Sequence, residues 1–149
     1  MSETLTGILR ALLGSFAGTV GFAMLVHVPK KSWLPCGLIA ALSYLVYWLL
    51  TAVAGLADPI GIFAGSLVGS VIGQLSARKM KTIATVFVMA AVVPVVPGLG
   101  LYRMMALPGQ GNMAAGGSQG IAAMITIAMI VLGISMGSFV DRMFNHRSS

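Results

Sequence analysis

Long apolar runs, separated by short clusters of charged residues, proline and glycine, make up most of this 149-residue chain. A helix needs about 20 apolar residues to cross a hydrocarbon core about 30 Å thick. The pattern predicts one transmembrane domain, residues 1–149, that is all-α and polytopic. We expect five membrane-spanning helices, the fourth of them broken, at about Leu5–Val28, Trp33–Leu56, Ile60–Ala77, Thr82–Met105 and Gly120–Val140.

The composition narrows the class of protein further. Hydrophobic residues make up 58% of the chain and charged residues 8%, against about 45–50% and 25% in soluble domains. So few charges argue against a soluble enzyme, and the scattered basic residues argue against a nucleic-acid-binding surface. The single cysteine, Cys36, excludes an intramolecular disulfide and a multi-cysteine metal site. We expect no metal, no cofactor and no catalysis.

The basic residues are distributed unevenly between the two ends of the predicted helices. Five crossings put the first loop, the third loop and the carboxyl-terminal tail on one side of the membrane. That side holds seven of the nine basic residues: Lys30, Lys31, Arg78, Lys79, Lys81, Arg142 and Arg147. The positive-inside rule then predicts an external amino terminus and a cytoplasmic carboxyl terminus.

Glycines recur every four residues in the third predicted span, at Gly61, Gly65, Gly69 and Gly73. Small residues at this spacing let helix backbones approach closely in a membrane. One interpretation is plain helix packing, and the other is a face along which helices slide during transport. Similar pairs, Gly14 with Gly18 and Gly133 with Gly137, suggest more glycine surface than five helices bury alone, and therefore a partner or a second copy.

The fourth span is interrupted by Pro94, Pro97, Gly98 and Gly100. Proline removes a backbone hydrogen bond and breaks a helix interior. Broken helices near the midplane are how many transporters present backbone groups to a solute. Tyr102 and Arg103 would add a hydroxyl group and a positive charge. These six residues are the candidate substrate-binding set. The alternative is a simple kink that leaves Tyr102 and Arg103 at the membrane interface.

The segment PVVPGLGLY, which begins at Pro94, resembles the signature of the threonine/serine exporter family, in its small-subunit or carboxyl-terminal-half form. Two further segments, Gly21–Pro29 (GFAMLVHVP) and Gly65–Arg78 (GSLVGSVIGQLSAR), are similar to that family in the same order. The resemblance covers essentially the whole chain, and the proline–glycine segment is its most specific part.

The resemblance implies one half of a secondary exporter in the bacterial cytoplasmic membrane, acting with a larger subunit. Members of the family are associated with threonine and serine efflux, and a two-component branch with succinate efflux. Arg103 is not part of the family pattern, so its role as a contact for a solute carboxylate is inferred from its chemistry. Two other classes stay open: a structural subunit whose partner alone binds solute, and a small homo-oligomeric channel.

Other polar residues have simpler interpretations. The segment GQGNMAAGGSQG after Pro108 is too glycine-rich and polar for a lipid-facing helix, so we expect a loop there. Ser118 in this segment fits a serine hydrolase pattern, but Asp141 lies at the far end of the fifth span, so we expect Ser118 to be a helix cap or loop residue. Asp58 is expected to cap the third helix, and Asp141 to form a solvated pair with Arg142. The Gln74 side chain could form a hydrogen bond to a neighbouring helix. We expect no carboxylate buried in the middle of any of the five spans, which would leave ion coupling to the partner.

Overall fold

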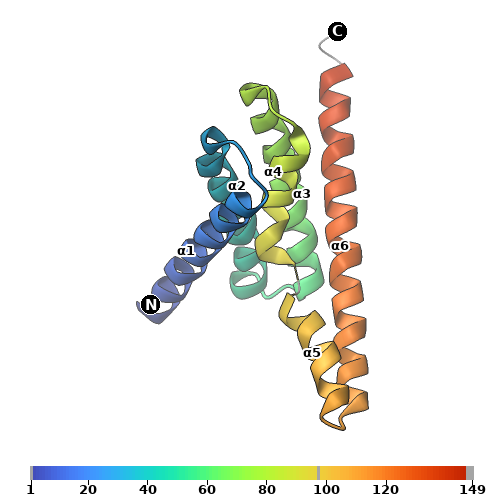
Figure 1. Ribbon diagram of the computed structural model, residues 1–149. Helices are drawn as coiled ribbons and strands as arrows, with labels where there is room; N and C mark the ends of the chain where they lie inside the picture. The colour runs from blue at the N-terminus through green and yellow to red at the C-terminus, as the bar shows by residue number, and fades with distance from the viewer. Residues whose placement is uncertain (1, 97, 147–149) are drawn as a thin grey trace.

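The structure is a computed structural model that describes residues 2–96 and 98–146, which form a bundle of helices (Figure 1). The α-helices are α1 (Ser2–Leu25), α2 (Trp33–Trp48), α3 (Asp58–Met80), α4 (Ala84–Val92), α5 (Gly98–Gly109) and α6 (Met113–His146). Three short turns join them: η1 (Lys30–Ser32), the π-helical η2 (Leu49–Val53) and the 3-10 turn η3 (Val93–Val95).

Four helical segments are long and apolar enough to cross a membrane: Thr6–Leu25, Lys30–Val53, Asp58–Met80 and Met113–Met143. The helices α4 and α5 pass the same test together but are bent by 52° at a short break. The fold therefore has up to five spans. This confirms the predicted all-α, polytopic membrane class.

Successive spans alternate in direction, with α4 and α5 together as one bent span, so the ends of the bundle differ in charge (Figure 1). The turn after α1 and the carboxyl-terminal ends of α3 and α6 lie at the upper end of the view. Lys30 and Lys31 form part of η1, Arg78 and Lys79 lie in the last turn of α3, and Arg142 lies near the end of α6. The basic residues in the described part of the chain that were predicted to share one side of the membrane therefore lie at one end of the bundle.

The buried core lies among α2, α3 and α4 and consists mostly of small residues around Phe87. Its main cluster contains Phe87 with Cys36, Ile39, Ala77, Ala90 and Ala91. A second cluster joins Ile62 of α3, Val95 of η3 and Ile130 of α6. Because lipid is as apolar as these side chains, helix association here depends on close packing and not on a hydrophobic driving force.

The last helix begins earlier than the sequence suggests. The segment before Gly120 was expected to be a glycine-rich loop, but α6 starts at Met113, so that prediction was wrong. The Asn112 Oδ1 atom accepts a hydrogen bond from the Ala115 backbone N–H at 3.2 Å, which caps the helix. Ser118 is therefore neither cap nor loop residue, and its hydroxyl donates to the Ala115 carbonyl within the helix.

Candidate functional site at the broken helix

The fourth span breaks where proline and glycine were expected to interrupt it. Helix α4 ends at Val92, and Pro94 lies in η3 because it has no backbone N–H to continue the helical hydrogen bonds. Val96 is extended, with φ −62° and ψ 130°, and α5 starts afresh at Gly98. The break therefore creates a second helix start, at which the Gly98 backbone N–H donates to the Val96 carbonyl at 2.8 Å and the following N–H groups lack the partners of a preceding helical turn.

The candidate substrate-binding residues lie along this break and the first turns of α5. Pro94 and Gly100 are half-buried, whereas Gly98, Tyr102 and Arg103 are exposed. Tyr102 is 67% exposed, and a Cβ atom added at Gly98 would meet nothing within 4 Å. Pro97 lies outside the described residues. The five described positions form a strip that is half-buried to exposed, and they do not enclose a cavity.

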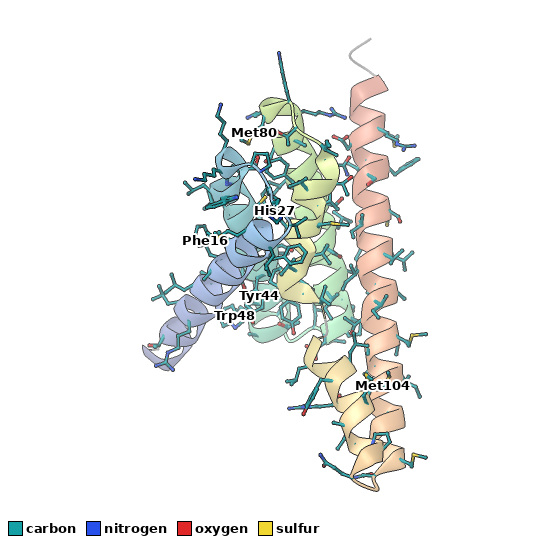
Figure 2. The ribbon with its side chains drawn as sticks, viewed as in Figure 1. Phe16, His27, Tyr44, Trp48, Met80 and Met104 are labelled. Carbon is teal, nitrogen blue, oxygen red and sulfur yellow. The ribbon has the colours of Figure 1, made fainter. Side chains whose placement is uncertain are left out.

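Helix α5 is held mainly by α6. No residue of α5 is buried. Two glycines of α6 allow the approach, because a Cβ at Gly116 would come 2.6 Å from the Pro108 ring and one at Gly120 would come 2.9 Å from the Met104 sulfur. Figure 2 shows Met104 between the two helices. The side chains at these two positions of α5, Met104 and Pro108, are apolar.

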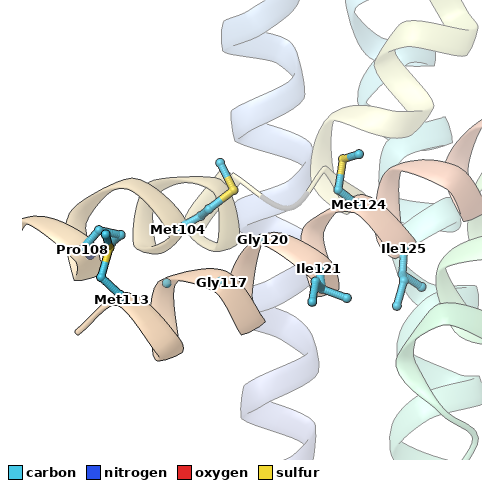
Figure 3. A pocket seen from close by; sticks show the side chains of 9 residues that line it. Met104, Pro108, Met113, Gly117, Gly120, Ile121, Met124 and Ile125 are labelled. Atoms are coloured by element: carbon cyan, nitrogen blue, oxygen red, sulfur yellow. The ribbon is translucent and has the colours of Figure 1, made fainter.

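A groove of about 580 Å³ follows this contact between α5 and α6 (Figure 3). Its lining is methionine, isoleucine, proline and glycine: Met104, Pro108, Met113, Gly116, Gly117, Gly120, Ile121, Met124 and Ile125. A second cavity of about 410 Å³, between α1, α4 and α6, is lined by Phe22 and aliphatic residues. Neither offers the charged or hydroxyl donors that a carboxylate needs, so the donors near the break are the backbone of α5 with Tyr102 and Arg103.

The glycines of α3 lie against the backbones of neighbouring helices. A Cβ atom at Gly65 would come 2.8 Å from the Ser43 carbonyl of α2, and one at Gly69 would come 2.8 Å from Ala91 Cβ of α4. Gly61 and Gly73 are buried in the same way, against Thr51 of η2 and Phe87 of α4. The glycines of α1, in contrast, have open space where a Cβ atom would lie: Gly7, Gly14, Gly18 and Gly21.

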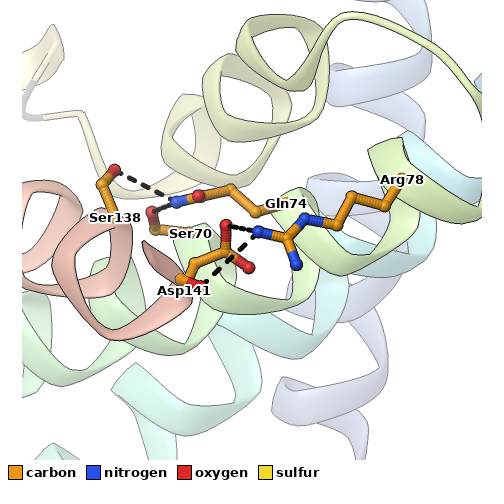
Figure 4. Close-up of polar contacts among 5 residues, drawn as sticks. All are labelled: Ser70, Gln74, Arg78, Ser138 and Asp141. Atoms are coloured by element: carbon orange, nitrogen blue, oxygen red, sulfur yellow. Dashed lines mark hydrogen bonds and ion pairs between the residues drawn. The ribbon is translucent and has the colours of Figure 1, made fainter. Parts of the chain in front are cut away.

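A ladder of polar contacts joins α3 to α6 (Figure 4). The Ser70 hydroxyl donates to the Ile134 carbonyl at 3.4 Å, and Gln74 Nε2 donates to Ser138 Oγ at 3.0 Å and to Ser70 Oγ at 3.2 Å. One turn further on, the Arg78 guanidinium forms an ion pair with Asp141. Gly133 and Gly137 of α6 pack against Ser66 and Ser70 of α3. We call these contacts the α3–α6 ladder.

One expectation about a carboxylate was wrong: Asp141 was expected to form a solvated pair with Arg142. No carboxylate was expected to be buried in the middle of a span, and Asp141 lies near the end of α6, outside the predicted span Gly120–Val140. Asp141 is 8% exposed and bonded to Arg78, whose side chain is 43% exposed. Because α3 and α6 run parallel, Arg78 reaches Asp141 across 63 residues of sequence. The spacing of Ser66, Ser70, Gln74 and Arg78 predicts that they share one face of a helix, but it does not identify the helix that this face contacts.

Asp58 has a different role from the one expected. The residue that caps α3 is Ala57, and no side chain bonds to the helix start. Asp58 is the first helical residue, is exposed, and accepts a hydrogen bond from the Tyr47 hydroxyl at 3.4 Å. A carboxylate in the first turn is favoured by the helix dipole without acting as a cap.

The comparison with known protein families agrees with this architecture. The family model described as threonine/serine exporter, ThrE, matches residues 11–140. The chain belongs to this exporter family. No solved structure matches it. As a member of the threonine/serine exporter family with up to five apolar spans, it is a multi-pass membrane protein of a transporter family.

Family membership also bears on the hydrolase-like pattern. Ser118 and Asp141 both lie on α6, and 23 residues of straight helix separate them by about 35 Å. They therefore do not form a catalytic arrangement, in agreement with a family of transporters. In the described residues, no group of three or more histidine, cysteine, aspartate or glutamate side chains could hold a metal ion.

Proposed function

We propose that this chain is the smaller membrane subunit of a secondary exporter for solutes that carry a carboxylate, with threonine or serine as the transported solute. The observation that carries the proposal is the bent fourth span, in which a new helix start, Tyr102 and Arg103 are left exposed beside an apolar bundle. Helix starts favour anions, and an arginine can hold a carboxylate with two hydrogen bonds.

The proposal includes a larger partner subunit of the same family. The strip from Gly98 to Arg103 is open on one side, and a charged solute in a membrane needs to be enclosed by protein. Among the described residues, the side chains of Tyr102 and Arg103 form no hydrogen bond or ion pair within this chain. A second subunit facing the strip would close the site, and a broken helix facing another set of helices suits alternating access.

The basic end of the bundle sets the proposed orientation. With the turn before α2 and the carboxyl-terminal ends of α3 and α6 in the cytoplasm, the amino terminus lies outside and the carboxyl terminus inside. This is the arrangement expected in a bacterial cytoplasmic membrane. Helix α5 and the first turns of α6 then lie toward the external side.

Efflux from cells loaded with threonine, serine or succinate tests this proposal. The chain is expressed alone, with the larger subunit, and not at all. We expect threonine or serine efflux only when both subunits are present, and a fall of about tenfold when Arg103→Gln removes the charged contact. Efflux with this chain alone would contradict the two-subunit proposal and favour the homo-oligomeric channel. Efflux of succinate alone would favour the dicarboxylate branch.

The structural-subunit alternative makes a different prediction for the same cells. If the partner alone binds solute, Arg103→Gln and Tyr102→Phe leave efflux unchanged while the complex stays intact. Co-purification of the two subunits from the same membranes separates a lost complex from a lost solute contact.

A further inference from the structure

One carboxylate and two tyrosine rings gather at the end of α2 that lies nearest the helix break. The rings of Tyr44 and Tyr47 are 5.6 Å apart between centroids, and the Tyr47 hydroxyl donates to Asp58 Oδ1 at 3.4 Å. Figure 2 shows Tyr44 and Trp48 at this end of the bundle. A carboxylate beside aromatic rings is a suitable environment for an ammonium group, which gains an ion pair and cation–π attraction.

This group of residues lies next to the break. The Tyr47 side chain packs against the cluster of Ile62, Val95 and Ile130, and Val95 belongs to η3. Helix α3 also contacts η3 directly. Ile62 lies one helical turn after Asp58, so the carboxylate and the start of α5 are at the same end of the bundle.

Local packing fixes Tyr47 with respect to Asp58. A Cβ atom at Gly61 would come 2.6 Å from the Thr51 methyl group and 3.1 Å from the Tyr47 ring, so only glycine lets α3 start this close to α2. The Thr51 hydroxyl donates to the Tyr47 carbonyl at 2.9 Å inside the segment that includes the π-helical turn. Single π-helical turns of this kind occur often at functional sites.

The charges of the described chain leave Asp58 available for a ligand. The sequence has three acidic residues: Glu3, Asp58 and Asp141. Asp141 is paired with Arg78 at the opposite end of α3, and Glu3 lies in the first turn of α1. Within the part of the chain that the structure describes, Asp58 forms no ion pair and is exposed.

We propose that Asp58, positioned by Tyr47, determines specificity by binding the ammonium group of an exported amino acid. This inference rests on the proposed function, in which the carboxylate of the same solute lies at the start of α5 with Arg103. A dicarboxylate would bring a second negative charge toward Asp58 and be rejected by repulsion. Asp58 thus selects amino acids over dicarboxylates at a site whose other contacts suit both.

The test compares two solutes that differ in the ammonium group. Threonine and 3-hydroxybutyrate share the carboxylate and the hydroxyl group, but only threonine has the ammonium. Efflux of each is measured from loaded cells that express both subunits with wild-type chain, Asp58→Asn, Asp58→Glu or Tyr47→Phe. We expect Asp58→Asn to lower threonine efflux about tenfold without lowering 3-hydroxybutyrate efflux. Asp58→Glu should restore part of the threonine efflux, and Tyr47→Phe should give a smaller loss with the same selectivity.

A purely structural role for Asp58 predicts a different result. Asp58→Asn would then lower efflux of both solutes together or change neither, and either outcome overturns the inference while the proposed function stands. Wild-type cells that export succinate in preference to threonine would also overturn it. Wild-type cells that export none of these solutes would overturn the proposed function, and this inference with it.

Discussion

The two halves of α6 are held to their neighbours by different chemistry. Its carboxyl-terminal half joins α3 through glycine contacts, directed hydrogen bonds and the Arg78–Asp141 ion pair. Its amino-terminal half carries α5 through apolar contacts beside an open groove. Hydrogen bonds fix one register between two helices, whereas contacts between apolar side chains are tolerant of small shifts. We infer that α3 and α6 form a fixed scaffold, and that α5 is the element that can adjust around a solute.

The largest effect should come from filling the close contact in the scaffold. A Cβ at Gly133 would come 2.8 Å from the Phe63 carbonyl, so Gly133→Leu should lower the free energy of unfolding by about 3 kcal/mol or more. Gly117→Leu is the matched control on the same helix, because nothing lies within 4 Å of that position, and its effect should stay within about 0.5 kcal/mol. Thermal unfolding in detergent measures the stability of both variants. Equal losses of stability would contradict the proposed difference between the two halves of α6.

A smaller effect is expected at the ion pair. Asp141→Ala leaves the Arg78 guanidinium without its carboxylate, which should cost about 2 kcal/mol because Arg78 still reaches water. The exchanged pair, Arg78→Asp with Asp141→Arg, should recover part of the loss in the melting temperature. An unchanged melting temperature for Asp141→Ala would show that the ion pair does not hold α3 and α6 together.

The sequence alone was sufficient to predict the features of the fold that depend on local composition. Apolar length predicts the spans, and Pro94 with Gly98 predicts the break, because helix interiors tolerate neither residue well. The glycine-rich start of α6 was wrongly predicted as a loop for the same reason. Gly116 and Gly120 lower helix propensity, but their contacts with Pro108 and Met104 are tertiary and do not show in a local pattern.

Long-range contacts explain the remaining differences between the sequence-based predictions and the structure. Asp141 was matched with Arg142 because they are adjacent, yet neighbouring residues on a helix point in different directions and do not face each other. Its true partner, Arg78, is identified only when α3 and α6 are known to be parallel. For the candidate site, the sequence predicts which residues line the break but not that they stay open on one side, since that depends on the direction of α5.

The central claim is that the exposed start of α5 acts in transport, and two leucine substitutions at the ends of α5 test it most directly. Gly98 and Gly109 both have open space where a side chain would go, so neither change should disturb folding. In cells that express both subunits at equal levels, we predict that Gly98→Leu lowers threonine efflux at least about tenfold and that Gly109→Leu leaves it unchanged. Equal efflux from the two variants would contradict the claim.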